Sequence, residues 1–282
     1  MNECRDGERV SLRFEQLSAE TRVAHGIFTR LGGASGPPYT SLNASISTGD
    51  NPAAVAHNQR LISDMLGLPL RAARPVHGAS VIEMTRDDGD WLPEYGPVRM
   101  RAASADAMVT RTPGVGLFWA YADCTPILLY DPAHHAAALV HAGWRGTSLA
   151  VARRAVEAMT ARYATCPGDL LAGIGPAIGA CCYAVSEEVR DRFRATPDVW
   201  AHACFEERPV EAEIEGETAS ASQLYLDLWE SNRRQLVAAG LRPEHIELAG
   251  ICSGCRTDLF YSHRVERGKT GRFGVAIGLL PA

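Results

Sequence analysis

The sequence predicts a single mixed α/β domain. Segments with the patterning of strands and of helices alternate irregularly along the 282 residues, and neither an internal repeat nor a linker-like stretch divides the chain. Hydrophobic residues make up 46% of the chain and charged residues 22%, which is typical of a soluble globular protein with one sizeable core. One domain containing both element types is therefore the expected fold class.

The individual elements are predicted from hydrophobic periodicity and from the turn residues that separate apolar segments. Strands are expected over residues 23–30, within 105–130, and over 170–174, 246–249 and 273–280. Helices are expected over 51–66, 147–163, from Ser186 onward and over 228–239. The acidic, weakly patterned segment 206–222 is expected to be an excursion on the surface.

The clearest predicted helix covers residues 147–163. Its apolar residues recur three and four positions apart, as one face of a helix requires, at Leu149, Ala152, Val156, Met159 and Tyr163. Either Thr147 or Ser148 is available as its N-cap. The helix over 228–239 is expected to end before Gly240, a residue type typical of the position that follows a helix.

A hairpin predicted around residue 132 brings a cysteine and a histidine together. Two apolar segments flank residues 131–134, which have the composition of a turn. If these four residues form the loop, Tyr130 pairs with His135 and Cys124 lies directly opposite His141, with Cβ atoms roughly 5 Å apart. The pair could share a metal ion or act as nucleophile and base. A one-residue change in the loop would place the two side chains on opposite faces of the sheet.

A third ligand for such a metal is expected at His77, because the following Gly78 leaves the imidazole open to approach. Two histidines and one cysteine with an open fourth position suit catalytic zinc. The same three residues without a metal suit a thiolate nucleophile assisted by histidine. The residues themselves leave both readings open.

Four further cysteines, Cys181, Cys182, Cys252 and Cys255, include one C-x-x-C pair and one vicinal pair. A structural zinc site normally needs two C-x-x-C-like pairs. The four are therefore expected to be thiols that are buried or lie at the edge of a pocket, rather than a second metal site.

Several classes of function are excluded by composition. The net charge of −5 and the lack of a block rich in Lys or Arg argue against nucleic-acid binding. No apolar stretch reaches membrane-spanning length, and the first residues lack the hydrophobic core of a signal peptide, so a cytoplasmic protein is expected. The nucleotide-binding patterns G-x-x-x-x-G-K-[ST] and G-x-G-x-x-G are absent, as is the H-x-E plus P-C-x-x-C signature of nucleobase deaminases.

Eight short motifs resemble those of one family, in the same order along the chain. They are Phe28-Thr29-Arg30 with Gly32-Gly33, Ser41-Leu42-Asn43, Asn58-Gln59-Arg60, Val76-His77-Gly78, Ala122-Asp123-Cys124-Thr125-Pro126, His141-Ala142-Gly143-Trp144-Arg145-Gly146, Ile174-Gly175-Pro176 and Thr270-Gly271-Arg272. The family is the YfiH/laccase-domain-containing family, once called multicopper polyphenol oxidases and now regarded as purine nucleoside enzymes. The resemblance runs from about residue 22 to 280, so residues 1–21 are expected to be an N-terminal extension and 22–282 one catalytic domain.

The resemblance implies a layered α/β/β/α fold and a zinc site formed by His77, Cys124 and His141. It also implies phosphorolysis of adenosine, inosine and methylthioadenosine, and deamination of adenosine, with a small nucleoside and phosphate as the binding partners. Some bacterial members are instead assigned to editing of peptidoglycan precursors. The sequence departs from the family pattern at Pro75, at Ala184 and at His263-Arg264-Val265, which bears on substrate preference and leaves the metal trio intact.

Roles for the remaining candidate residues follow from this reading. Asp123, the carboxylate adjacent to Cys124, is a candidate general acid for deamination. Candidates for holding phosphate or ribose are Arg30, Asn43, Arg60, Arg145, Arg264 and Arg272.

Three other functions compete with this reading. Copper-dependent polyphenol oxidation requires a three-copper cluster, usually built from His-x-His motifs, and none of the nine histidines forms one, so any copper binding is expected to be adventitious. An amidase could act on a UDP-muramyl conjugate, with Cys124 or a metal-bound water attacking. A non-catalytic metal-binding protein would hold the ion without any turnover.

Overall fold

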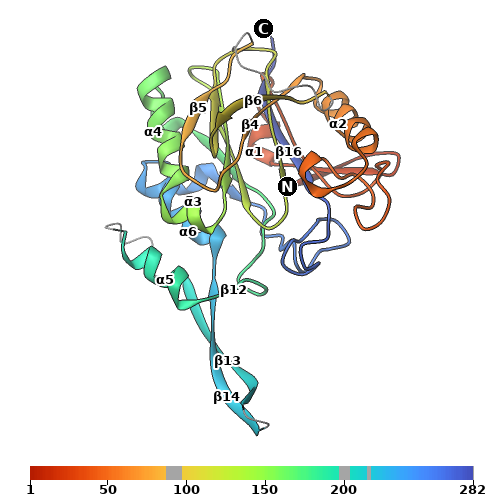
Figure 1. Cartoon of the computed structure of the whole chain (residues 1–282). Helices are drawn as coiled ribbons and strands as arrows, with labels where there is room; N and C mark the ends of the chain where they lie inside the picture. Colours follow the sequence, from red (N-terminus) through yellow and green to blue (C-terminus); the bar gives the residue numbers. More distant parts are fainter. Residues whose placement is uncertain (87–96, 197–203, 215–216, 282) are drawn as a thin grey trace.

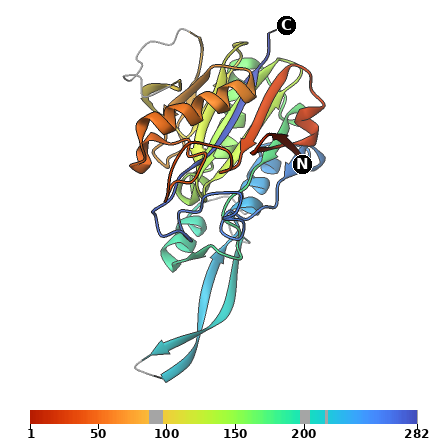
Figure 2. The same cartoon turned by 90° about the vertical axis from the view of Figure 1, so that its right-hand side faces the viewer.

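The computed structural model describes residues 1–86, 97–196, 204–214 and 217–281. For residues 211–214 and 217–221 it describes the backbone only. Two β-sheets stack on each other, and helices cover their outer faces (Figures 1 and 2). Residues of both sheets share one hydrophobic core, as Leu128 and Val275 illustrate. The expected mixed α/β fold with an α/β/β/α layering is confirmed.

The first sheet has seven strands and mixed orientation. Its strand order is β1 (Asn2–Asp6), β2 (Arg9–Arg13), β3 (Val23–Phe28), β16 (Phe273–Leu279), β8 (Gly116–Tyr121), β4 (Leu70–Arg74) and β6 (Arg99–Ser104). Helix α2 (Pro52–Leu66) covers its outer face with the buried residues Ile62 and Leu66. The N-terminal residues thus contribute two strands to one end of this sheet.

The second sheet has six strands and carries most of the predicted site. Its strand order is β15 (Ile246–Leu248), β11 (Leu171–Ile174), β9 (Thr125–Asp131), β10 (Ala136–Ala142), β7 (Ala107–Thr110) and β5 (Val81–Glu83). Its outer face packs against α4 (Val151–Tyr163) and α6 (Leu228–Ala238) in a second apolar core. Strands β9 and β10 are buried along their whole length, which explains their continuous apolar sequence.

The predicted hairpin forms, but its register differs from the prediction by two positions. Asp131 pairs with Ala136, so the four-residue loop is 132–135 and His141 lies opposite Pro126. Asp131 closes the strand because its side chain accepts hydrogen bonds from the backbone N–H groups of the next turn, at 2.9 and 3.0 Å. A shift of two positions preserves the face of the sheet, so Cys124 and His141 remain on the same side.

The helix predicted over 147–163 is broken into two. Helix α3 (Trp144–Ser148) ends before Ala150, which has a left-handed backbone (φ 60°) and precedes α4. Thr147 is therefore no N-cap: it is buried in α3, where its carbonyl accepts a hydrogen bond from the Gln235 side chain of α6. Ser148 also lies within α3, and its hydroxyl donates back to the Arg145 carbonyl at 2.8 Å. Contacts with α6 thus override the periodicity of the segment.

Most other predicted elements are confirmed within one or two residues, including β3, α2, β11, β15, β16 and α6. Gly240, with φ 101°, follows the end of α6 as expected. Helix α5 (Glu187–Arg194) begins after Ser186, and the short helix α1 (Glu15–Ser18) lies beside β3. No helix of the described segments is long and apolar enough to cross a membrane.

The segment predicted as a surface excursion is an arm of two long strands that projects from the body of the molecule (Figure 1). The arm consists of β13 (Phe205–Ile214) and β14 (Glu217–Leu226), and β12 (Ala184–Val185) pairs with its base. The excursion is confirmed, whereas its strand structure is a finding of the tertiary structure.

Candidate active site

His77, Cys124 and His141 meet at one end of the stacked sheets. Cys124 immediately precedes β9, His141 lies in β10, and His77 lies in the loop between β4 and β5. One ligating atom from each of the three residues lies within 4.8 Å of the other two, and the two imidazole rings are 5.0 Å apart between centroids. The three side chains predicted from sequence are therefore brought together.

Asp106 positions two of these residues, through the backbone of His77 and the side chain of His141. Its buried carboxylate accepts hydrogen bonds from the backbone N–H groups of His77 (2.9 Å) and Gly78 (2.7 Å), and it lies 2.9 Å from Nδ1 of His141. Burial opposes ionisation, but the bonds from His141 and Gly78 lower the pKa of Asp106 below its ordinary value. The ionised carboxylate only accepts, so Nδ1 of His141 carries a proton, which leaves Nε2 to interact with the other two residues.

The Cys124 thiol and the His141 imidazole each stabilise the charged form of the other. Burial raises the pKa of Cys124, but the opposing charge of His141, with hydrogen bonds from both histidines, lowers it to about 6. Burial likewise disfavours the charged form of His141, whereas Cys124 and Asp106 raise its pKa to about 10. A thiolate is the form of cysteine that binds metals and attacks electrophiles.

Gly143 leaves the space that this arrangement requires. A Cβ atom at this position would lie 2.9 Å from Sγ of Cys124 and 3.4 Å from Cδ2 of His77. The backbone of Gly143 is extended and open to any residue (φ −74°, ψ 171°), so the constraint is purely steric. The glycine of the His-Ala-Gly-Trp-Arg-Gly motif therefore preserves the room for the cysteine sulfur.

A cavity of about 810 Å³ opens beside the trio. Among the described residues, its lining combines the trio with arginines and with aromatic rings. The arginines are Arg74, Arg145, Arg264 and Arg272, and the rings are those of Phe118, Trp119, Tyr121, Trp144 and Tyr183. Such a cavity has the size and the mixed polarity of a small-molecule site.

Half of the predicted phosphate- and ribose-binding residues reach this cavity. Arg145 lies over the ring of Trp144 and Arg264 over that of Tyr183. Arg272 is half-buried and donates to the carbonyls of Thr270 and Gly271.

The other half lie outside the cavity lining. Arg30 forms an ion pair with Glu266 at 3.0 Å and stacks on Tyr261. Asn43 is fully buried, where its side chain bonds to neighbouring loop residues and to the backbone N–H of Arg272. Arg60 is exposed on α2. Arg30 and Asn43 therefore support the loops around the site.

Asp123 lines the cavity but has its carboxylate occupied. One oxygen accepts from the Ser253 hydroxyl and the other from the backbone N–H of Arg264, both at 2.7 Å. The residue adopts a left-handed backbone with φ 82°. These bonds tie two distant loops to the residue next to Cys124, which is a positioning role.

The three departures from the family pattern lie close to this cavity. Pro75 and His263 belong to its lining, and the carbonyl of Ala184 accepts a hydrogen bond from the Arg264 side chain at 2.6 Å. Differences at these positions therefore change the lining of the cavity or the hydrogen bonding of its arginine.

Sequence reasoning missed Asp106, Arg74 and Tyr183. Asp106 carried a usable signal, since it is the single charged residue in the apolar segment 105–109. A buried carboxylate in such a segment requires partners, and ligand-orienting carboxylates are a common case. Arg74 and Tyr183 had no local signal, because only folding places them beside the trio.

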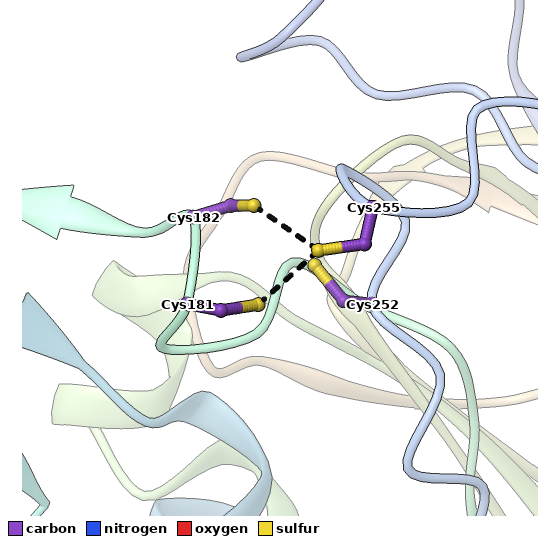
Figure 3. A group of neighbouring side chains, drawn as sticks. All are labelled: Cys181, Cys182, Cys252 and Cys255. Atoms are coloured by element: carbon purple, nitrogen blue, oxygen red, sulfur yellow. Dashed lines mark hydrogen bonds between the residues drawn. The ribbon is translucent and has the colours of Figure 1, made fainter.

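Folding also brings together the four cysteines that were expected to be thiols that are buried or lie at the edge of a pocket. Cys181, Cys182, Cys252 and Cys255 form a cluster outside the cavity lining (Figure 3). Spacing in sequence gave no sign of this cluster, because the two distant turns meet only in the fold.

The fold and this site define a known class of proteins. The family model for multi-copper polyphenol oxidoreductase laccases matches residues 24–280, and the chain belongs to this family.

Among relatives, the purine nucleoside phosphorylase YlmD of Geobacillus stearothermophilus is 36% identical over 257 residues, covering 90% of this chain and 89% of the relative. The purine nucleoside phosphorylase YfiH of Escherichia coli is 32% identical, over 89% of this chain and 92% of its own. The crystal structure of the Geobacillus stearothermophilus YlmD superposes with a TM-score of 0.84 at 32% identity, covering 99% of both chains.

Proposed function

We propose that this protein is a purine nucleoside phosphorylase that acts on adenosine, inosine and methylthioadenosine. The observation that carries the proposal is one cavity in which the His77, Cys124 and His141 trio lies beside several guanidinium groups and aromatic rings. Relatives that align over nine-tenths of the chain carry the name purine nucleoside phosphorylase. Phosphorolysis needs these two features together, a subsite for an anion and one for a flat base.

The arginines supply the anion subsite. Among the described lining residues, Asp123 is the one carboxylate, and each of its oxygens already accepts a hydrogen bond. Stacking on Trp144 and Tyr183 restricts the guanidinium groups of Arg145 and Arg264. Guanidinium groups held in this way suit bidentate contacts with phosphate.

The aromatic wall suits the purine. The Trp119 indole N–H donates to the Ala73 carbonyl at 2.7 Å and the Tyr121 hydroxyl to the Val140 carbonyl at 3.0 Å, so both rings are fixed before substrate arrives. In the reaction, a phosphate oxygen bonds to C1′ of the ribose while the bond from C1′ to the purine nitrogen breaks. The electron pair leaves with the base, which takes up a proton.

The trio fits a single metal ion, which we propose to be Zn²⁺. His77, Cys124 and His141 would hold it, Asp106 orients His141, and the cavity leaves a fourth side open. When bound, the ion supplies Lewis-acid chemistry at the end of the cavity. The donor set has room for one ion rather than the copper cluster of a laccase, and the other metal-capable group among the described residues contains no histidine.

The direct test measures hypoxanthine release from inosine by purified protein, with and without phosphate, for wild type, Cys124→Ser and Cys166→Ser. Cys166 is an exposed cysteine outside both clusters and serves as the matched control. We expect phosphate-dependent release that Cys124→Ser loses and Cys166→Ser keeps. Unchanged turnover in Cys124→Ser, or release that needs no phosphate, would refute the proposal. Release of an amino acid from a UDP-muramyl conjugate by a protein inactive on inosine would establish the amidase reading instead.

A second pair of variants tests the anion subsite. Arg264→Met removes a cavity guanidinium, whereas Arg256→Met removes a surface guanidinium paired with Asp258. A hydrogen bond to a charged group contributes about 1.5–3 kcal/mol, so the KM for phosphate should rise roughly 10- to 100-fold in the first variant only. An equal KM in both variants would remove Arg264 from the subsite.

Deamination of adenosine is a second activity that the same cavity supports, because the base would lie beside the trio. Asp123 is poorly placed as the general acid, since both of its oxygens already accept hydrogen bonds. Formation of inosine from adenosine without phosphate, unaffected by Asp123→Asn in a folded variant, is the expected result. Lack of inosine formation by an enzyme active in phosphorolysis would exclude this activity.

A further inference from the structure

The four-cysteine cluster brings together two turns that are far apart in sequence. Cys181 and Cys182 lie in the turn after β11, and Cys252 and Cys255 lie in the turn after β15. All four sulfur atoms lie within 4.8 Å of one another, and Sγ of Cys255 is 3.5 Å from those of Cys181 and Cys182 (Figure 3). We propose that these four cysteines bind one Zn²⁺ as a tetrahedral tetrathiolate, separate from the trio in the cavity.

The sulfur spacing matches a zinc site. A Zn–S bond of about 2.3 Å with tetrahedral angles places sulfur atoms about 3.8 Å apart. The observed 3.5 Å pairs and the 4.8 Å upper limit bracket this value, so small side-chain rotations suffice to close the shell. Four sulfur ligands in a tetrahedral arrangement are the donor set of zinc or of iron–sulfur centres.

The surroundings are those of a thiolate cluster. The backbone N–H of Gly179 donates to Sγ of Cys252 at 3.2 Å, which stabilises negative charge on that sulfur. Cys252 is buried, whereas Cys181 and Cys255 are exposed, so an ion can enter from solvent. The guanidinium of Arg208, which is ion-paired with Glu206, donates to the Ala180 carbonyl at 3.2 Å and so ties the turn of the vicinal cysteines to β13.

A glycine makes the close approach of the two turns possible. A Cβ atom on Gly254 would lie 3.2 Å from Cβ and 3.3 Å from Sγ of Cys182. Gly254, one of the two residues between the ligands of the C-x-x-C turn, is thus small where the vicinal cysteines approach. This packing brings Cys181 and Cys182 to the C-x-x-C turn as the second pair of ligands, which the spacing in sequence did not predict.

The position of the cluster assigns the ion a structural role beside the cavity. Ser253, inside the C-x-x-C turn, donates from its hydroxyl to Asp123, the neighbour of Cys124, and from its N–H to the Ala177 carbonyl at 2.9 Å. Tyr183, which lines the cavity, directly follows the vicinal cysteines. A metal that joins the two turns therefore holds the wall of the cavity without touching substrate.

Metal analysis of wild type, Cys255→Ser, Cys124→Ser and the control Cys166→Ser tests the site. The proteins are purified under reducing conditions without chelators, and zinc per chain is measured by mass spectrometry. Cys255→Ser should contain about one zinc fewer than wild type, whereas Cys166→Ser should equal wild type. Cys124→Ser should retain the cluster zinc, which separates this proposal from the one for the cavity.

Cobalt substitution provides a spectroscopic readout in addition to metal content. Apo protein titrated with Co²⁺ should develop the thiolate charge-transfer absorption and the intense visible bands of a tetrahedral sulfur-rich site. Cys255→Ser should weaken these bands, and its thermal unfolding midpoint should fall relative to Cys166→Ser. Equal zinc in Cys255→Ser and wild type, iron in place of zinc, or an intact mass showing two disulfides in freshly reduced protein would each overturn the proposal.

Discussion

Replacing Asp106 by asparagine tests whether the trio depends on one buried carboxylate. One Asp106 oxygen, Oδ1, accepts from the His77 N–H and lies 2.9 Å from Nδ1 of His141, while Oδ2 accepts from the Gly78 N–H. Asparagine has the same shape but offers one acceptor oxygen and one donor NH₂ group. Whichever way the amide is turned, its NH₂ group faces at least one N–H donor.

The expected loss in the free energy of unfolding follows from these contacts. A hydrogen bond to a charged group contributes about 1.5–3 kcal/mol, and a buried donor left without a partner costs about 1–3 kcal/mol. Asp106→Asn should therefore lower the free energy of unfolding by roughly 3–5 kcal/mol, a large share of the 5–15 kcal/mol of an ordinary domain. Loss of the carboxylate that orients a metal-binding histidine should also weaken metal binding about 10- to 100-fold.

The assay combines urea unfolding at fixed metal concentration with metal content and nucleoside turnover. Asp258→Asn is the control, because Asp258 is exposed and pairs with a surface arginine. That variant should change the free energy of unfolding by less than about 1 kcal/mol. If Asp106→Asn were as stable as this control, with full metal content and turnover, the reasoning about the trio would be wrong.

Two other predictions concern Gly143 and His25. Gly143→Ala should displace the Cys124 sulfur, because the new Cβ would lie 2.9 Å from it, and should abolish metal binding at the trio while the fold is retained. The control Gly36→Ala, whose Cβ would have no atom within 4 Å, should leave the metal content unchanged. Equal metal content in both variants would contradict the steric argument. Burial, and then the charge of Arg13, lower the pKa of His25 from 6.5 to about 4. The unfolded chain therefore binds more protons between these pH values, and the stability from neutral His25, present above pH 6.5, is lost as pH falls toward 4. Urea unfolding at pH 7.5 and 5 should show a loss roughly 2 kcal/mol larger in wild type than in His25→Gln, and equal losses would exclude His25 as the cause.

Local sequence was sufficient to predict elements whose structure depends on their own apolar residues and on the turns that flank them. The apolar segments of β9 and β10 and the turn composition around residue 132 predicted the hairpin, and thereby the shared side of Cys124 and His141. Its exact register was not accessible, because it depends on which residue the Asp131 carboxylate caps. A two-residue error was harmless to the site only because side chains alternate with a period of two.

Tertiary contacts decided where the helix breaks and which arginines reach the cavity, neither of which a local sequence pattern predicts. The break between α3 and α4 places Thr147 against α6, at the cost of one continuous helix. Arginines that look alike in sequence divide between a cavity, in the case of Arg264, and a structural ion pair, in the case of Arg30. Nothing within a few residues of either one distinguishes them.

The sequence by itself determined the family, the mixed fold and the three residues of the trio, because short motifs with strict steric and chemical requirements carry them. Only the tertiary structure decided that Asp106 lies behind the trio and that two turns unite four cysteines. The physical reason is that such groups interact across sheets and turns 35 and 74 residues apart, a separation over which no local periodicity operates.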